Sequence, residues 1–359
     1  MKYIKLSIIT IVFILSSCGN KNKFLLPTTE IDSTALQFDT ILGKQVDIDV
    51  VGAREIYSFD NLLFIESKDP KAFVKVYSLG NYDSIAELCA KGRASNEFIN
   101  PRSVCKQLYK DGDHIMLLMF DNVDVQKTVD VTESIEKHYT VVSKSETSLT
   151  NETRGSSVYN NVTDEWFVNK RVSYIDPRDH IYFPPQFYFS KNGVEKEVPV
   201  ISELMNFPED SSYPLYVYEG DLRLKPDGSK ISFTCYNMPY IYVFDANNKT
   251  GKAFHECGKL SYNDDYESDD VTDIDLFYLD ACVTDDYIIC VYGDGKQSEY
   301  DANKRPIIKS FNWDGKCLFG FYPDQRIYNI AYDDNAHKLI GLDVRTEKVY
   351  EYDVQEFLL

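Results

Sequence analysis

The stretch that decides the fold is Lys309–Asp353, which reads KSFNWDGKCLFGFYPDQRIYNIAYDDNAHKLIGLDVRTEKVYEYD. Apolar and polar residues alternate along it, and many of the apolar ones are β-branched or aromatic. The alternation breaks at Asp314-Gly315, Asp333–Asn335 and Arg345-Thr346. Alternating segments separated by such turns are typical of antiparallel hairpins. The stretch therefore predicts the outer hairpin of one sheet followed by three strands of the next.

The rest of the chain repeats this unit, a turn marker followed by a strand. The markers are Asp60-Asn61, Asp111–Asp113, Asp176–Asp179, Pro226–Gly228, Asp285-Asp286 and Asp333–Asn335. For the third unit, Asp164-Glu165 is an alternative marker. A repeat of about 55 residues with four short strands per unit is typical of a β-propeller. We therefore predict an all-β fold, a six-bladed β-propeller with four antiparallel strands per blade, formed as a single domain by residues 40–359.

The last unit is one strand short. After Tyr352 only Asp353–Leu359 remain, too few for a complete outer strand, whereas Ile41–Val51 has the strand pattern but no unit of its own. We expect this N-terminal strand to complete the sixth blade beside Lys348–Tyr352, because closing the ring removes exposed strand edges. No helix of any length is expected.

Composition sets the class of protein and excludes some partners. Hydrophobic residues make up 43% of the 359, so the chain can fill a core, and 27 tyrosines and 21 phenylalanines suit stacked strands. Lys and Arg number 38 against 57 Asp and Glu, which gives a formal net charge of −19. This charge repels phosphate backbones and anionic lipid surfaces, so no nucleic acid partner is expected.

The N-terminus carries a targeting signal. Lys2 and Lys5 precede an apolar run, Leu6–Leu15, that is too short to span a membrane. The following Leu15–Gly19 (LSSCG) resembles a bacterial lipobox, which implies cleavage before Cys18 and acylation of that cysteine. We expect a lipoprotein signal peptide over residues 1–17 and a lipid-anchored flexible tether over residues 18–39. An ordinary signal peptide with an incidental cysteine is the alternative.

A turn motif and the C-terminal strands resemble a known family. Lys91–Pro101 (KGRASNEFINP) looks like the G-x-G/A-x-x-E-F-x-x-P turn of six-bladed propeller lipoproteins, with Ala94 in place of the second glycine. Together with the lipobox and Phe311–Gly315, this turn makes residues 40–355 similar to the TolB-like six-bladed β-propeller family. The resemblance implies the fold and a place in the cell envelope, but no biochemical role. Because Gly19–Lys23 lacks an acidic export tag, we expect the outer membrane facing the periplasm, with surface exposure as the alternative.

The same turn supplies the candidate ligand contacts, because it lies between the first and second blades at a mouth of the propeller channel. The candidate contacts are Arg93, Asn96, Glu97 and Arg102. The alternative is structural: Glu97 accepts backbone N–H groups of the turn, Phe98 packs between blades, and Gly92 takes a positive φ. A turn whose residues fix its own geometry needs no ligand, which favours the structural interpretation.

No pattern for metal, cofactor or covalent chemistry stands out. The acidic run from Asn263 to Asp275 could bind Ca²⁺, but it lacks the glycine and the spaced bidentate acid of a calcium loop, so a solvated loop is favoured. The seven cysteines after Cys18 include no Cys-x-x-Cys pair and favour buried free thiols, with one disulfide as the alternative. The sequence contains no Gly-x-Ser-x-Gly or His-Glu-x-x-His motif, and its five histidines are scattered. No metal site and no cofactor are predicted.

These observations favour a binding protein over an enzyme. A lipid anchor, a rigid ring and the lack of a reaction motif predict a non-catalytic envelope scaffold whose partner is a protein, a peptide or a glycan. The alternative is a hydrolase or lyase at the channel mouth, acting on glycans or peptides. Such an enzyme would need carboxylates or histidines that converge from several blades. A purely structural assembly subunit is a third hypothesis.

Overall fold

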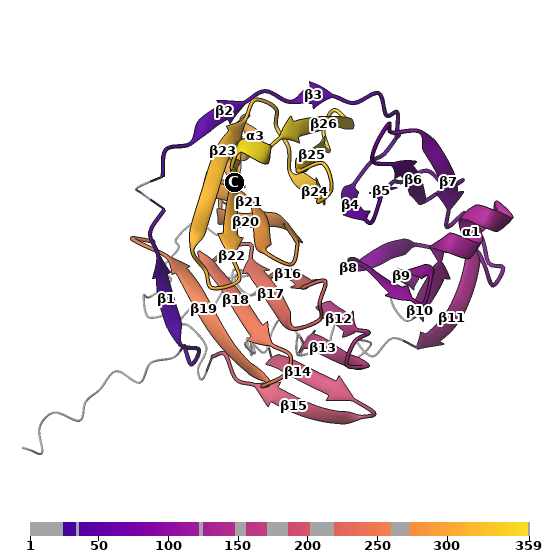
Figure 1. Ribbon diagram of the computed structural model, residues 1–359, viewed down its shortest axis with the longest axis horizontal. Coiled ribbons are helices and arrows are strands. Elements are labelled where there is room, and N and C mark those ends of the chain that lie inside the picture. Colours follow the sequence, from indigo (N-terminus) through magenta and orange to yellow (C-terminus); the bar gives the residue numbers. More distant parts are fainter. Residues whose placement is uncertain are drawn as a thin grey trace, which may run out of the picture.

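The computed structural model describes residues 24–33, 36–121, 125–147, 156–170, 186–201, 219–259 and 273–357. Within these ranges the strands form six sheets placed around a central axis like the blades of a propeller (Figure 1). In each sheet, the four strands of the blade run antiparallel to their neighbours from the axis outwards. The all-β, six-bladed β-propeller with four antiparallel strands per blade is confirmed.

The first three blades each contain four strands in sequence order. Blade 1 consists of β4 (Glu55–Phe59), β5 (Leu62–Glu66), β6 (Val74–Ser78) and β7 (Ser84–Leu88). Blade 2 consists of β8 (Pro101–Asp111), β9 (His114–Asp121), β10 (Val125–Asp130) and β11 (Val141–Thr147). Blade 3 consists of β12 (Ser156–Asn160), β13 (Glu165–Lys170), β14 (Gln186–Lys191) and β15 (Val194–Val198).

The last three blades combine strands from both ends of the chain. Blade 4 consists of β16 (Gly220–Leu224), β17 (Lys230–Cys235), β18 (Tyr240–Asp245) and β19 (Thr250–Glu256), with β1 (Thr28–Ile31) added. Blade 5 consists of β20 (Asp275–Val283), β21 (Tyr287–Lys296), β22 (Ile307–Asn312) and β23 (Cys317–Pro323), with β2 (Asp39–Ile41) added. Blade 6 consists of β24 (Asn329–Asp333), β25 (Lys338–Asp343), β26 (Lys348–Asp353) and β3 (Lys44–Gln45). Lys309–Asp353 thus supplies the outer hairpin of blade 5 and three strands of blade 6, as its pattern predicted.

Residues 24–33 and 36–45 run along the outside of the ring, and we call them together the N-terminal strap (Figure 1). β1 pairs parallel with β19, and β2 pairs parallel with β23. Phe24, Leu26 and Ile31 are only 4%, 6% and 2% exposed. The sequence assigned these residues to a flexible tether. They are instead packed on the ring, because their apolar side chains fill its outer edge.

The two ends of the chain meet in blade 6. β3 pairs antiparallel with β26 through two residue pairs, Gln45–Tyr350 and Lys44–Glu351. This pairing is much shorter than the Ile41–Val51 strand that the sequence suggested. Ile41 is not available to β26, because it lies in β2 opposite Pro323 of blade 5.

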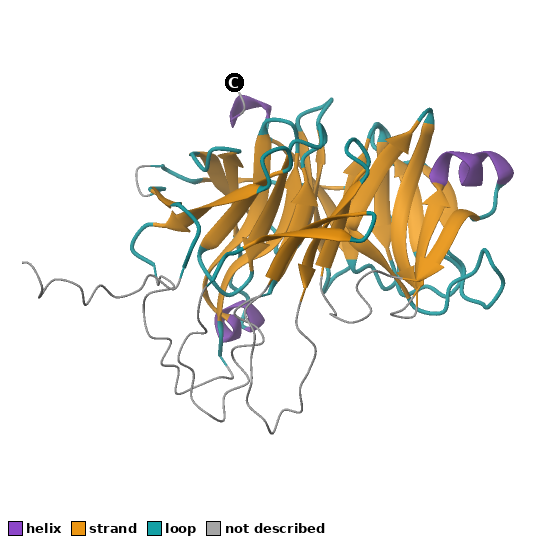
Figure 2. Ribbon diagram, turned by 90° about the horizontal axis from the view of Figure 1, so that it is seen from below, coloured by secondary structure: helices purple, strands orange, loops and turns teal. Residues whose placement is uncertain are grey.

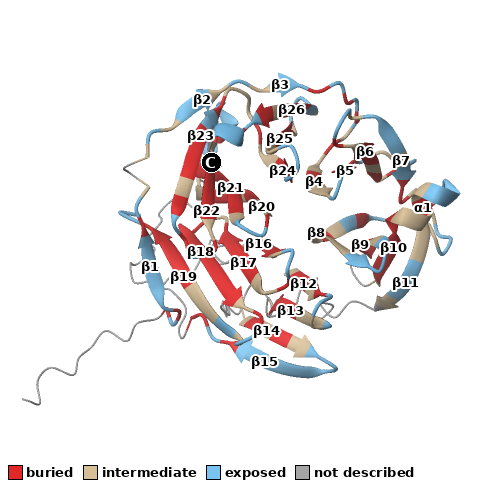
Figure 3. Cartoon of the chain, viewed as in Figure 1, coloured by how far each residue is buried: buried red, intermediate tan, exposed pale blue. Residues whose placement is uncertain are grey.

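The core lies between neighbouring blades, where buried faces meet, while much of the outer strands is exposed (Figure 3). The largest cluster joins blades 3 and 4 and is rich in aromatic rings. Phe244 packs with its ring centroid 4.7 Å from that of Phe167 and 4.9 Å from that of Phe187. Such tilted aromatic contacts bury large areas and rigidify the blade junction.

Among the residues that the structure describes, two short helices interrupt the strand pattern, whereas no helix was expected. They are α1 (Val131–Lys137) and α3 (Gln297–Asp301), and a 3-10 turn, η2 (Gln355–Phe357), follows the last strand. Asp130 is the N-cap of α1: its carboxylate accepts the Glu133 N–H at 2.8 Å, and such a cap favours helix formation. In the part of the chain that the structure describes, no helix is both long and apolar enough to cross a membrane.

The ring has two faces, marked by its two helices (Figure 2). α1 lies on the face that carries the tight turns after the inner strands, which we call the turn face. α3 lies on the opposite face, where the chain passes from one blade to the next, which we call the connection face. The turn before β13 ends at Asp164, so Asp164-Glu165 is the marker of the third blade. The first choice, Asp176–Asp179, lies outside the described residues.

Candidate functional site

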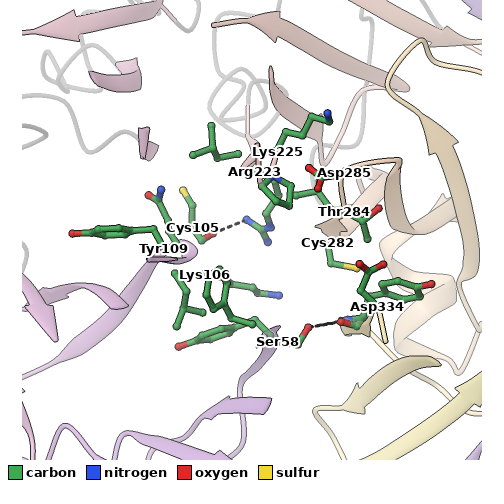
Figure 4. A pocket seen from close by; sticks show the side chains of 18 of the residues that line it. Ser58, Cys105, Lys106, Tyr109, Arg223, Lys225, Cys282, Thr284, Asp285 and Asp334 are labelled. Carbon is green, nitrogen blue, oxygen red and sulfur yellow. Dashed lines mark hydrogen bonds between the residues drawn. The ribbon is translucent and has the colours of Figure 1, made fainter. Parts of the chain in front are cut away.

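A cavity of about 500 Å³ opens at the axis of the ring on the turn face. It is lined by the C-terminal halves of the six inner strands β4, β8, β12, β16, β20 and β24 and by the turns that follow them. Residues far apart in sequence are neighbours there; the Ser58 hydroxyl, for example, donates to the Tyr332 carbonyl at 2.6 Å. Every blade thus contributes to one site, and Figure 4 labels side chains from five of the blades.

The walls of the cavity carry both apolar and polar side chains, and its rim is polar. The wall residues include Tyr57, Phe59, Leu108, Tyr109, Leu224 and Tyr332. The rim residues include Asp60, Lys110, Asn161, Lys225, Asp285 and Asp334. A concave site that combines apolar surface with polar groups can bind a ligand, since apolar burial supplies affinity and the polar groups orient the ligand.

An irregularity in the inner strand of blade 2 shapes the site. β8 pairs Ser103 with Met119 and then Leu108 with Leu117. Residues 104–107 therefore lie opposite a single residue of β9 and form an irregular bulge. Within this bulge Cys105 and Lys106 both have positive φ angles, 50° and 53°. Positive φ angles at two consecutive non-glycine residues raise the conformational energy of the backbone, and they persist only where the surrounding structure holds them. The bulge brings both residues to the cavity wall, and Figure 4 shows Lys106 extending inwards.

Lys106 belongs to a buried group of charges that we call the axial cluster (Lys106, Asp221, Arg223 and Asp280). Lys106 Nζ lies 2.6 Å and 2.7 Å from the two carboxylate oxygens of Asp280 and 3.0 Å from Asn329 Oδ1. Arg223 Nη2 lies 3.1 Å from an oxygen of Asp280 and 3.1 Å from an oxygen of Asp221. The side chains of Lys106, Arg223 and Asp280 are 7%, 7% and 3% exposed. The cluster joins blades 2, 4, 5 and 6 at the inner end of the cavity.

Arg223 has an acceptor for each of its five N–H groups. Besides the two carboxylates, Nε donates to the Ala281 carbonyl at 2.7 Å, and Nη1 donates to two further backbone carbonyls. Burial opposes the charge, but Asp221 and Asp280 raise the pKa of Arg223 well above its ordinary value. Arg223 is therefore a permanent and fully bonded cation, which stabilises the inner strands and has no N–H left for a ligand.

Two more carboxyl groups lie behind the axial cluster and do not line the cavity. Glu66 Oε1 accepts the Tyr57 hydroxyl at 3.2 Å and the Ser103 N–H at 3.0 Å. Glu55 lies opposite Glu66 across the β4–β5 pair. Burial and the nearby Glu66 raise the pKa of Glu55 from 4.5 to about 7, although Lys106 opposes the rise. Glu55 therefore exchanges a proton near neutral pH.

Side chains bridge neighbouring blades around the cavity. Gln107 pairs with both backbone groups of Tyr159 in blade 3, accepting its N–H at 2.7 Å and donating to its carbonyl. Asn160 Nδ2 donates to the Gly228 carbonyl of blade 4 at 2.7 Å. These bonds hold the inner strands in one arrangement, so the cavity is preformed and a ligand need not order it.

The turn Lys91–Pro101 matches the structural interpretation with one exception. Glu97 Oε2 accepts the Ala94 N–H at 2.9 Å, and Phe98 is fully buried. The positive φ predicted for Gly92 is wrong. The absence of a side chain matters there for another reason: a Cβ atom would lie 1.8 Å from Glu97 Oε2, so any other residue would displace the Glu97 carboxylate.

None of the four candidate contacts in this region lines the cavity. Arg93, Asn96 and Glu97 precede β8 on the connection face, and Arg102 is the second residue of that strand, whereas the cavity lining in β8 begins at Cys105. The Arg102 guanidinium instead stacks 5.5 Å from the centroid of the Phe120 ring. A ligand role for these four residues stays a prediction, and it concerns the opposite mouth of the channel.

Other sequence features are only partly covered by the structure. Cys18 with its signal peptide, and residues 263–270 of the acidic run, lie outside the described residues. Asp273 accepts the Ser298 N–H at 2.9 Å, and Asp275 forms a 3.0 Å ion pair with Lys296. Among the described residues, no group of three or more His, Cys, Asp or Glu could hold a metal ion. Their seven cysteines are free thiols, of which Cys257 is exposed.

Neither the cavity nor the axial cluster was predicted from the sequence. One signal was available for the cluster, since Arg223 stands between Leu222 and Leu224 in an inner strand, and a charge in such a setting is buried only with a partner. The cavity itself had no signal. Its lining comes from six segments whose convergence depends on the closed ring.

Comparisons with known proteins bear on the fold. No family model matches the chain, and no curated protein matches it. A solved structure of a DUF4221 family member from Bacteroides vulgatus is similar, with a TM-score of 0.55 and 10% identity over 89% of this chain and 97% of that chain. A Bacteroides fragilis protein described as exported has a TM-score of 0.52 and 10% identity, over 91% of this chain and 99% of that chain.

A third structure, Raptor from Chaetomium thermophilum, has a TM-score of 0.49 and 10% identity, and the match covers 88% of this chain but only 29% of that one. The similarity to the two Bacteroides proteins, at 10% identity, shows the propeller fold alone.

Proposed function

We propose that this propeller is a non-catalytic binding scaffold of the cell envelope that takes part of a protein, peptide or glycan into the cavity on the turn face. The observation that carries the proposal is the cavity of about 500 Å³ to which all six blades contribute. Tyr109 and Tyr332 offer aromatic surface to a side chain or a sugar ring. Rim groups such as Asn161 and Asp334 can orient the bound group through hydrogen bonds.

The location proposed for this scaffold rests on the N-terminus. The LSSCG stretch supports acylation at Cys18 and attachment to the outer membrane on its periplasmic side. A structurally similar protein is described as exported, which supports transport to the envelope. Membership of the TolB-like propeller family is part of the same proposal and is supported by the Lys91–Pro101 turn.

The proposal can be tested by filling the cavity. Val283 lies at its wall at the end of β20, and Val283→Trp should occupy the space that a ligand needs. Val194→Trp is the matched control, because Val194 is 73% exposed on the outer strand of blade 3. Titration of the full chain with defined panels of peptides and oligosaccharides should find saturable binding in the wild type. That binding should be lost in Val283→Trp and kept in Val194→Trp, whereas equal affinity in both variants, or no binding by the wild type, contradicts the proposal.

A second candidate function is hydrolysis or elimination at the channel, on glycans or peptides. One observation favours it: Glu55, Glu66, Asp221 and Asp280 converge from blades 1, 4 and 5, and Glu55 exchanges its proton near pH 7. Two carboxyl groups with different pKa values are what general acid–base catalysis needs. Against this candidate, none of the four lines the cavity, and Asp221 and Asp280 are held by cations.

The enzyme hypothesis has its own test. Chromogenic glycosides and a quenched peptide library should be turned over by the wild type with a rate that falls as Glu55 titrates near pH 7, and Glu55→Gln should abolish this turnover. Turnover that is unchanged in Glu55→Gln would exclude Glu55 as the acid. The absence of turnover across both panels would leave the binding scaffold as the better account.

A further inference from the structure

The N-terminal strap is fixed to the ring almost from its first described residue. The Phe24 ring centroid lies 5.1 Å from that of Tyr240 and 5.7 Å from that of Tyr242, both in β18 of blade 4. Phe24 also forms an antiparallel bridge with Ile201, and the neighbouring Leu25 N–H donates to the Val200 carbonyl of blade 3 at 2.8 Å. Phe24 is therefore anchored at the outer edge of the junction between blades 3 and 4.

The sequence leaves few residues between this point and the proposed site of acylation. Only Gly19–Lys23 separate Cys18 from Phe24. A residue spans at most about 3.3–3.6 Å when fully extended, so the six steps from Cys18 to Phe24 reach roughly 20 Å. The tether predicted from the sequence alone, residues 18–39, would have allowed more than three times that reach and any orientation of the ring.

We propose that the ring is held close to the membrane by one side, the outer edge of blades 3 and 4 around Phe24, so that blade 1 faces away from the lipid. This inference rests on the acylation of Cys18 proposed above. The partner surface is the lipid bilayer itself, reached through the acyl chains. Lys21 and Lys23 add a weak attraction to anionic headgroups, while the excess of acidic over basic residues in the chain, 57 against 38, keeps the ring off an anionic surface.

This attachment has a consequence for the ligand site. The N-terminal strap that holds the anchor point runs along the outside of the ring (Figure 1), whereas the cavity opens at the axis on the turn face. A ring attached by its perimeter keeps the mouth of the cavity in water, where a partner from the same aqueous compartment can reach it. The short segment between Cys18 and Phe24 also keeps the mouth of the cavity near the membrane surface.

The native thiols supply a probe for this geometry. Cys257 is the exposed cysteine among those described, it follows β19 in blade 4, and its N–H donates to the Ile31 carbonyl of the strap at 2.9 Å. Cys105 and Cys282 are partly buried, and burial raises their pKa values to about 11 and 12, so they react slowly with maleimides near pH 7. A fluorophore can therefore be placed on Cys257 in the full acylated protein.

The experiment compares this position with one across the ring. Ser84 is exposed in β7 of blade 1, opposite blade 4, so Ser84→Cys in a Cys257→Ser background carries the comparison label. Both proteins are inserted into phosphatidylethanolamine and phosphatidylglycerol vesicles that contain a metal-chelating headgroup as a short-range quencher. We expect several-fold stronger quenching at Cys257 than at Ser84→Cys. Twenty Gly and Ser residues inserted after Lys23 should remove most of the difference.

The outcomes separate this inference from the proposed anchor. Mass analysis of the N-terminal peptide shows whether Cys18 is acylated. If the protein is acylated but the label is quenched equally at the two positions, the proposed orientation is wrong although the anchor is present. The same holds if the difference in quenching remains after the Gly and Ser residues are inserted. A protein without acyl chains that stays off the vesicles overturns the anchor, and the orientation falls with it.

Discussion

Arg223 shows at the scale of one residue how the ring is fastened at its axis. Its guanidinium bonds two carboxylates and three backbone carbonyls that belong to blades 2, 4 and 5. Removing Arg223 would leave Asp221 without its ion-pair partner and Asp280 with Lys106 alone, and such a loss costs far more than the loss of an exposed pair. Arg223 is therefore expected to be a strong determinant of stability although it cannot contact a ligand.

Arg223→Met tests this role against a matched surface arginine. We expect the free energy of unfolding to fall by about 3–5 kcal/mol, because Asp221 and Asp280 lose their shared partner. Arg345→Met removes an exposed ion pair with Asp301 and should cost no more than about 1 kcal/mol. Urea denaturation of both variants at pH 7 measures the two values. Similar losses in the two variants would show that the axial cluster contributes no special stability.

Glu55 gives a second prediction, on the pH dependence of stability. The folded protein keeps the Glu55 proton up to about pH 7, whereas the unfolded chain releases it at its ordinary pKa of 4.5. Folding therefore binds a proton between these values, and the contribution of this group to stability falls as the pH rises through that window. Glu55→Gln removes the titration. The Tm of Glu55→Gln minus that of the wild type should thus rise from pH 4 to pH 8, and a difference that does not change with pH contradicts the assignment.

At the scale of elements, the antiparallel strands of the blades could be predicted from the sequence. The parallel strand β1 and the helix α1 could not. The hairpins of Lys309–Asp353 follow from a clear period-two pattern. The residues of β1 do not alternate between buried and exposed: three of the four are exposed and only Ile31 is buried. The sequence therefore contains no period-two pattern that would mark β1 as a strand. α1 was missed for a different reason. Its Asp130 and Glu133 form a recognisable helix start, but seven residues are too few for a visible helical period.

Truncating the Phe24 side chain tests what holds the N-terminal strap on the ring. Phe24→Ala should loosen the strap locally, because a buried phenylalanine contributes about 3–5 kcal/mol to the packing that holds it. Leu25→Ala is the matched control, since Leu25 is 45% exposed. Hydrogen exchange of the peptide covering residues 24–31 should accelerate at least tenfold in Phe24→Ala and little in Leu25→Ala. An equal change in both variants would mean that Phe24 does not fix the strap.

At the scale of the whole molecule, the ring creates the site. The repeat of turn markers was enough to predict six blades, because each marker is a local signal. The ring also closes with only two residue pairs between β3 and β26, so the length of that strand could not be read from the alternation of Ile41–Val51. The cavity depends on the positions of six inner strands around one axis, and no local pattern contains that information.

The proposed function requires that the protein binds its partner in this preformed cavity. A crystal structure of the full chain with the tightest-binding peptide or oligosaccharide from the panels would show the binding site itself. We expect a side chain or sugar ring of the probe to lie among Tyr109, Leu224 and Tyr332, with the axial cluster unchanged beneath it. A probe bound on the connection face near Arg93 and Glu97, or along an outer strand edge, with the cavity empty, would contradict it.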